Sequence, residues 1–169
     1  TNGGSTTTLA TNTLYYLPFI IFEDCQIDGV NIVINGGTGN SGDLAQIAIY
    51  GPVPGDLSNV PKIATTSTFA VDSGYGKSAA ITATSVTAGV YLYCITANTA
   101  SLGVRGYGSP SSFINYMVGV SSASFVGGCY SAQYSQNTVS TFPHSYPSSV
   151  NAGQANHLNT SYQFKYLVV

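Results

Sequence analysis

Residues 13–22 have the sequence TLYYLPFIIF, in which 14–22 form the longest apolar stretch of the chain. The stretch is far shorter than the roughly 18–20 residues that a transmembrane helix needs, and Pro18 interrupts it. A short run of apolar, aromatic and β-branched side chains between polar residues is typical of a buried strand. We therefore predict a strand over 13–22 in the centre of a sheet, and no insertion into a membrane.

Segments with alternating side chains follow it along the chain. In one of them, Val30, Ile32 and Ile34 share one face of the expected strand. The predicted strands after the first are 26–35, 44–50, 64–71, 77–84, 90–97, 113–120 and 161–169, with 124–131 and 137–141 as further candidates. No segment keeps apolar residues at helical spacing. The pattern predicts an all-β fold: a two-sheet antiparallel sandwich, jelly-roll-like, with about eight strands.

The connections between these strands differ between the two halves of the chain. In the first half they are short, and we expect residues 72–76 to join 64–71 and 77–84 as a hairpin turn. The C-terminal half contains long loops rich in Gly, Ser, Pro and Tyr, at 98–112, 127–136 and 142–160. Loops of this length inside a compact domain are usually functional. We therefore expect recognition in the C-terminal half.

The chain has very little charge. Only 6% of its residues are Asp, Glu, Lys or Arg, against about 25% in an ordinary soluble domain. The four cations are scattered, so we expect no basic surface for nucleic acid. The remaining polar groups are amides and hydroxyls, which suit neutral, hydroxyl-rich partners such as sugars, or identical copies of the chain. Between Lys77 and Lys165 the only full charge is Arg105.

The cysteines are Cys25, Cys94 and Cys129, and their odd number excludes a complete disulfide framework. We expect three small buried thiols, with one disulfide and one free thiol as the alternative. No Cys and His residues have the local spacing of a metal site. The cysteines therefore predict no metal centre.

Residues 37–42 match the pattern G-x-G-x-x-G directly after a predicted strand. A dinucleotide site needs a helix next, because the helix N-terminus holds the pyrophosphate. The strand pattern of 44–50 follows instead. We interpret the glycines as a loose hairpin loop and expect no cofactor.

Groups for catalysis are scarce. The chain has no G-x-S-x-G elbow and only two histidines, His144 and His157. All six acidic residues precede residue 73, and most lie in expected turns, where two carboxylates are poorly placed to face each other across a substrate. We predict that the protein is not an enzyme.

The only acidic cluster is Glu23-Asp24 with Asp28. Backbone carbonyls could complete a calcium site there, but we prefer the interpretation as a solvated turn. Asn159 begins a glycosylation sequon, which has meaning only if a eukaryote secretes the protein.

The candidate binding residues lie in the long loops. Tyrosine among Ser, Gly and Asn is the composition of recognition loops, because its ring offers contact area with few rotors. The prolines around His144 stiffen the backbone and lower the entropy lost on binding. The predicted ligand-binding residues are Arg105, Tyr107, Tyr130, Gln133, Tyr134, His144 and Tyr146. The alternative is that these tyrosines cap the core or fill a subunit interface.

Residues 15–97 also contain a set of short motifs in a characteristic order. The motifs are YLPFI at 16–20, CQIDGV at 25–30, AIYG at 48–51, PGDL at 54–57, DSG at 72–74 and AGVYL at 88–92. Together they resemble the β-sandwich modules near the C-termini of bacteriophage tail fibres and related virion proteins. The resemblance covers about half of the chain, and its motifs are structural, so it transfers no binding residues.

The resemblance implies the head domain of a homotrimeric fibre that binds a host surface receptor, often a polysaccharide. We then expect residues 1–12 to be a flexible linker from an upstream shaft and 13–169 to be a single β-sandwich head domain. Its partner would be a host glycan or an outer-membrane receptor. Its location would be the virion, assembled in the host cytoplasm. The alternatives are a structural virion module, for capsid decoration or fibre assembly, and a polysaccharide depolymerase.

Overall fold

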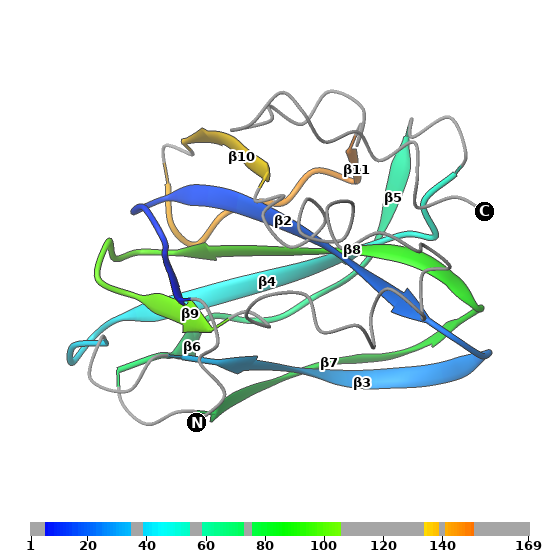
Figure 1. The fold of residues 1–169 in the computed structure, drawn as a ribbon, viewed down its shortest axis with the longest axis horizontal. Helices are drawn as coiled ribbons and strands as arrows, with labels where there is room; N and C mark the ends of the chain where they lie inside the picture. The colour runs from blue at the N-terminus through cyan, green and yellow to red at the C-terminus, as the bar shows by residue number, and fades with distance from the viewer. Residues whose placement is uncertain are drawn as a thin grey trace, which may run out of the picture.

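The structure, a computed structural model, describes residues 6–34, 39–54, 59–72, 76–105, 134–138 and 141–150. Over these residues the chain forms strands and no helix (Figure 1), so the prediction of an all-β fold is confirmed. The strands are β1 (Thr6–Thr8), β2 (Thr13–Ile21), β3 (Cys25–Val33), β4 (Leu44–Tyr50), β5 (Val60–Thr65), β6 (Phe69–Ala70), β7 (Gly76–Val86), β8 (Gly89–Ala97), β9 (Gly103–Arg105), β10 (Tyr134–Thr138) and β11 (Ser149–Val150). In this part of the chain no helix could span a membrane.

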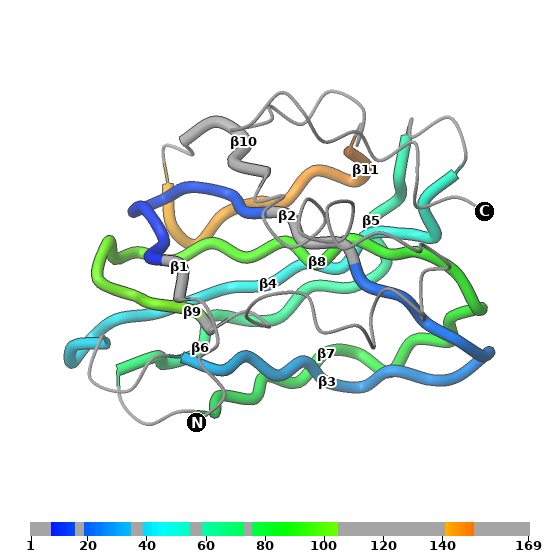
Figure 2. Tube along the Cα trace, viewed as in Figure 1, coloured from blue at the N-terminus to red at the C-terminus, as the bar shows by residue number. Residues whose placement is uncertain are grey.

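The strands pair antiparallel in one large sheet and two small ones. The large sheet has the order β10-β2-β8-β4-β5-β11, and β6 pairs with one end of β4. β3 pairs with β7, and β1 pairs with β9. A bridge between Ile34 and Val104 connects the end of β3 to β9, so the small sheets are joined. The β3–β7 sheet lies against one side of the large sheet (Figure 2).

The central strand β4 is buried on both faces. Ala45, Ile47 and Ile49 belong to a core cluster that includes side chains of the β3–β7 sheet. Ala48 and Tyr50 belong to a second cluster, on the opposite face. Because alternate side chains of a strand point to opposite faces, the large sheet has packing partners on both sides. One partner is the β3–β7 sheet, which makes the β-sandwich, and the other is the segment 141–150 (Figure 1).

Most strands predicted in the first half of the chain are found. The strand at 44–50 is β4 to the residue, and 13–22, 26–35 and 90–97 match β2, β3 and β8 to within two residues at each end. The strand predicted at 137–141 appears as β10, three residues earlier. The strands predicted at 113–120, 124–131 and 161–169 lie outside the described residues.

The hairpin predicted between 64–71 and 77–84 is wrong. The first of these segments contains the end of β5 and all of β6, which both pair with β4 in the large sheet. The second lies in β7, which pairs with β3 in the other layer. The connection between β6 and β7 therefore crosses from one layer to the other.

The glycine-rich loop has a structural role. Residues 39–43 lead from the β3–β7 layer into β4, so the loop is neither a hairpin nor the start of a helix. The carboxylate of Asp43 accepts hydrogen bonds from the backbone N–H of Asn40 at 2.7 Å and from the hydroxyl of Ser101 at 3.1 Å. Nearby, the Asn98 side chain accepts a bond from the N–H of Leu44 at 2.8 Å. These hydrogen bonds between groups of the protein itself stabilise the turn that leads into β4.

The cysteines only partly follow the prediction. Cys94 is buried in the second core cluster, but Cys25 is exposed, so the prediction of a buried thiol is wrong there. Cys25 begins β3 at the end of the sandwich, directly after the exposed residues Glu23 and Asp24. Cys129 lies outside the described residues.

Candidate functional site

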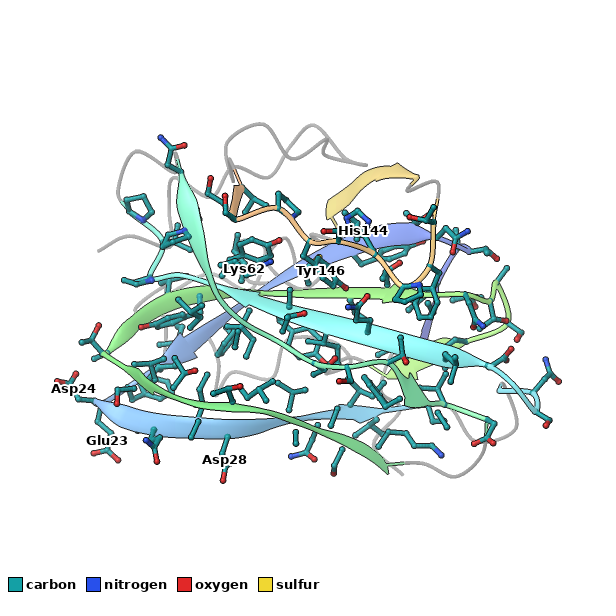
Figure 3. The ribbon with its side chains drawn as sticks, turned by 180° about the vertical axis from the view of Figure 1, so that it is seen from behind. Glu23, Asp24, Asp28, Lys62, His144 and Tyr146 are labelled. Carbon is teal, nitrogen blue, oxygen red and sulfur yellow. The ribbon has the colours of Figure 1, made fainter. Side chains whose placement is uncertain are left out.

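Residues 141–150, which we call the strap, run along the outer face of the large sheet (Figure 3). Exposure alternates along most of the strap: Thr141, Pro143, Ser145 and Pro147 are exposed, and the residues between them are more buried. The last two residues form β11, which pairs with the start of β5. The strap thus behaves as an extended segment with one face on the sheet and one face toward solvent.

Two side chains of the sheet bind the strap through its backbone. Gln46 of β4 accepts a hydrogen bond at Oε1 from the N–H of His144, at 2.9 Å. The ammonium of Lys62 in β5 donates to the carbonyl of Tyr146 at 2.7 Å. The backbone N–H of Lys62 donates to the carbonyl of Ser148, also at 2.7 Å. Because these bonds use backbone groups of the strap, they fix its path and its register.

Tyr146 is the buried anchor of the strap. Its side chain is only 5% exposed and packs in the second core cluster with Leu14, Tyr50 and Leu92. Its hydroxyl donates to the backbone carbonyl of Gln46 at 2.8 Å. This placement corrects the prediction that Tyr146 stacks on a ligand, because the ring has no exposed face. It agrees with the alternative, in which the tyrosine caps the core.

His144 lies beside this anchor and stays partly exposed. Its ring meets the ring of Tyr146 edge to face, with 5.2 Å between centroids. Partial burial lowers the pKa of His144 below the ordinary value of 6.5, and the positive charge of Lys62 lowers it further. The structure therefore keeps His144 neutral at a pH where a free histidine begins to take up a proton.

This pKa predicts how stability depends on pH. The pKa of His144 is lower in the folded protein than in the unfolded chain, so the unfolded chain binds the proton more readily. The contribution of His144 to stability is complete above pH 6.5 and decreases as the pH falls through the folded-state pKa. We expect His144→Gln to remove this part of the pH dependence. Urea unfolding of both proteins at pH 7.5 and 5.0 tests it, and identical pH dependence in both would contradict it.

The other predicted binding residues are placed only in part. Arg105 ends β9, with its backbone opposite Thr6, and Tyr134 begins β10, opposite Tyr16. These two residues belong to different sheets. Tyr107, Tyr130 and Gln133 lie outside the described residues. Of the predicted set, the structure brings together His144 and Tyr146.

Gln46 and Lys62 belong to the site but were not among the predicted residues. Gln46 lies in a strand that was predicted correctly, and nothing in the sequence indicates that its side chain binds a segment about 100 residues later. Lys62 precedes the predicted strand 64–71, so it lay outside the predicted strands. A lysine at an alternating position between Val60 and Ala64 is the signal that could have placed it in a strand.

Of the acidic cluster, Glu23 and Asp24 lie in the exposed turn between β2 and β3, whereas Asp28 lies within β3, so the prediction of a turn is wrong for Asp28. Glu23, Asp24 and Asp28 are all exposed, and Figure 3 shows them directed away from the sandwich. One oxygen of Asp24 accepts a hydrogen bond from the N–H of Ala88 at 2.9 Å. Within the described residues, no three His, Cys, Asp or Glu side chains are close enough together to hold a metal ion.

The strap and its two supporting side chains are thus the best-defined site in the described structure. Comparisons with protein-family models, curated proteins and solved structures find no match to this chain.

Proposed function

We propose that this chain is the head domain of a virion fibre, a non-enzymatic module that binds a glycan or outer-membrane receptor on a bacterial host. In this proposal the domain forms a homotrimer at the end of a shaft and is part of the virion, which assembles in the host cytoplasm. The resemblance of residues 15–97 to tail-fibre modules motivates it.

The observation that most supports this proposal is the neutral polar surface of the β3–β7 sheet. Its exposed positions are Cys25, Gln26, Asp28, Gly29, Asn31 and Val33 on β3, and Gly76, Ser78, Ala80, Thr82, Ala83 and Ser85 on β7. Of these only Asp28 is charged. The amides and hydroxyls among them can bond to sugar hydroxyls with little desolvation of charge.

The proposal predicts that tyrosines of the long loops contribute to binding. We expect the double variant Tyr107→Ala with Tyr130→Ala to bind host cells at least about tenfold more weakly, since hot-spot aromatic residues contribute about 2 kcal/mol or more. Tyr146 is left unchanged because it is buried. The measurement is binding of the labelled full chain to host cells and to a glycan array.

A matched control is Phe22→Ala, which removes an aromatic ring that is 63% exposed directly after β2. Because Phe22 lies outside the long loops, we expect this variant to lose much less binding than the double variant does. Equal binding by the double variant and the control would reject the loop tyrosines as the binding residues. A single monomeric species in sedimentation at all concentrations would count against the trimeric head.

A structural virion module is the second candidate. Two large apolar side chains, Phe22 directly after β2 and Val33 at the end of β3, are exposed at 63% and 47%. Such side chains also fit a contact between subunits, because interface cores are depleted of charge. A module of this kind would assemble without binding host cells.

A depolymerase would release oligosaccharides from purified capsule, which the head domain is expected not to do.

A further inference from the structure

A cluster of polar side chains lies where two loops meet, at the end of the sandwich opposite Glu23 and Asp24. One loop, 39–43, leads into β4, and the other, 98–102, joins β8 to β9, and both lie at the left of Figure 1. We call Asn40, Asp43, Thr99 and Ser101 the Asp43 cluster. Asn40 is exposed and the other three residues are partly exposed, so the cluster lies at the surface.

One hydrogen-bonded network joins the four side chains, and the hydroxyl of Ser101 is its centre. This hydroxyl donates to Oδ2 of Asp43 at 3.1 Å and accepts from Nδ2 of Asn40, also at 3.1 Å. The hydroxyl of Thr99 lies 2.7 Å from it and must donate, because the single hydrogen of Ser101 goes to Asp43. The amide of Asn40 and the carboxylate of Asp43 are therefore held in fixed positions around one oxygen atom.

Asn98 holds the two loops together beside this network. Its side chain donates to the carbonyl of Gly42 at 3.2 Å and accepts from the N–H of Leu44 at 2.8 Å. A Cβ atom at Gly42 would have nothing within 4 Å, so the space on this side of the loop is open. The cluster is thus fixed by both loops and open to solvent, which keeps the conformational entropy lost on binding small.

The network leaves an acceptor and a donor unused. Both bonds that the carboxylate of Asp43 accepts end at Oδ2, so Oδ1 is bonded to no described residue. The buried polar atoms without a partner among the described residues do not include Oδ1, so this oxygen is open to solvent. Nδ2 of Asn40 has two N–H donors and uses one of them, for Ser101. Because Ser101 holds both side chains, this acceptor and this donor lie close enough together to contact one sugar ring.

We propose that the Asp43 cluster binds two neighbouring hydroxyls of a neutral sugar. Oδ1 of Asp43 accepts a hydrogen bond from one hydroxyl, and Nδ2 of Asn40 donates to the next. Hydroxyls suit this pair because each can donate to a carboxylate or accept from an amide. This inference rests on the proposed function, in which the partner is a glycan, and it names the class of that glycan and its site.

The charge of the cluster favours a neutral ligand. The carboxylate of Asp43 has no cationic partner among the described residues, where the ion pair joins Lys77 to Asp72. Asp43 would therefore repel the carboxylate of an acidic sugar. A calcium ion needs about six to eight oxygen ligands, and the described residues contain no group of three His, Cys, Asp or Glu side chains that could hold a metal ion. A neutral sugar fits the single carboxylate and its amide neighbour best.

The test follows the amide NMR signals of residues 39–43 and 98–102 in the full chain during titration with sugars. The neutral probes are maltotriose, methyl α-mannoside and methyl β-galactoside, whose neighbouring hydroxyls differ in orientation, and the acidic probe is trigalacturonate. We expect at least one neutral probe to shift these signals, and trigalacturonate to leave them unchanged. Shifts with none of the neutral probes, or equal shifts with trigalacturonate, would overturn the proposal.

Two variants identify the groups that bind. Asn40→Ala removes the amide but keeps the backbone N–H that bonds to Asp43, so we expect the turn to stay folded. We expect the neutral probe that shifts the signals to bind about three- to tenfold more weakly to this variant, the usual cost of one hydrogen bond. Ser101→Ala removes the hydroxyl that positions both side chains, and a similar loss is expected. The matched control is Ser67→Ala, which changes an exposed serine between β5 and β6 and is expected to keep the affinity. Full affinity in Asn40→Ala would reject this amide as a sugar contact.

The outcomes separate this inference from the proposed function. Host-cell binding without any shift of the loop signals by the neutral probes would reject the sugar site and leave the proposed function in place. Shifts by a neutral probe without host-cell binding would support the site and count against the fibre head. Equal shifts with calcium chloride alone would contradict the assignment to a sugar, because the cluster would then be a cation site.

Discussion

Replacement of Gly39 by alanine is expected to lower the free energy of unfolding by about 3 kcal/mol, at the upper end of the usual cost of overpacking. A Cβ atom at this position would overlap the carbonyl oxygen of Val71 and lie 2.9 Å from its carbonyl carbon. Both are backbone atoms, so no side-chain rotation can relieve the clash. The backbone of Val71 is itself held, because its N–H donates to the carbonyl of Asp43 at 2.9 Å.

Gly76→Ala is the matched control for this prediction. Gly76 begins β7, and a Cβ atom there would have nothing within 4 Å. We expect its free energy of unfolding to stay within about 0.5 kcal/mol of the unchanged chain. Urea unfolding followed by tyrosine fluorescence and circular dichroism measures both variants. Equal stability of the two variants would show that the close approach of Gly39 to Val71 is not a feature of the folded protein.

The result also bears on the glycine-rich motif. Residues 37–42 were predicted to form a loop because a strand follows them, and β4 does follow in the structure. The structure supplies a physical reason for one of the glycines, which is contact between two backbones. That reason depends on Val71, more than 30 residues away, so periodicity and local propensity could not reveal it.

The strands were more predictable than their partners. β4 was predicted to the residue because Ala45, Ile47 and Ile49 alternate in the sequence with Gln46, Ala48 and Tyr50, between polar turns. The strand that pairs with β7 was predicted wrongly, because the sequence at 72–76 suits a hairpin turn and a crossover between layers equally well. Only the three-dimensional packing places Ile81 of β7 in the same core cluster as Val30 and Ile32 of β3.

The strap shows the same limit at the candidate site. His144 and Tyr146 were selected because they lie in a loop rich in proline and tyrosine. Their partners, Gln46 and Lys62, lie 84 to 100 residues earlier in the chain. A tyrosine in such a loop fits a ligand contact or a core contact, and only burial distinguishes the two. For Tyr146 the core contact is found, whereas His144 keeps the exposure that a binding residue needs.

Replacement of Tyr146 by alanine is expected to cost about 3–5 kcal/mol, the usual cost of removing a large buried aromatic side chain. The ring fills the space between the strap and the large sheet, so its loss leaves a cavity beside Tyr50, Leu92 and Cys94. Tyr146→Phe keeps the ring and loses the hydrogen bond to the carbonyl of Gln46, so we expect a smaller cost of about 1–3 kcal/mol.

The control for both variants is Phe22→Ala, since Phe22 is 63% exposed and its removal is expected to change stability by less than about 0.5 kcal/mol.

Hydrogen exchange in the strap provides a second measurement, because the N–H of His144 is bonded to the side chain of Gln46, next to the ring that Tyr146→Ala removes. We expect this N–H to exchange faster in Tyr146→Ala than the N–H groups of β3 and β7, which belong to the opposite layer. Equal unfolding free energies for Tyr146→Ala and Phe22→Ala would mean that the strap does not pack on the sheet in solution.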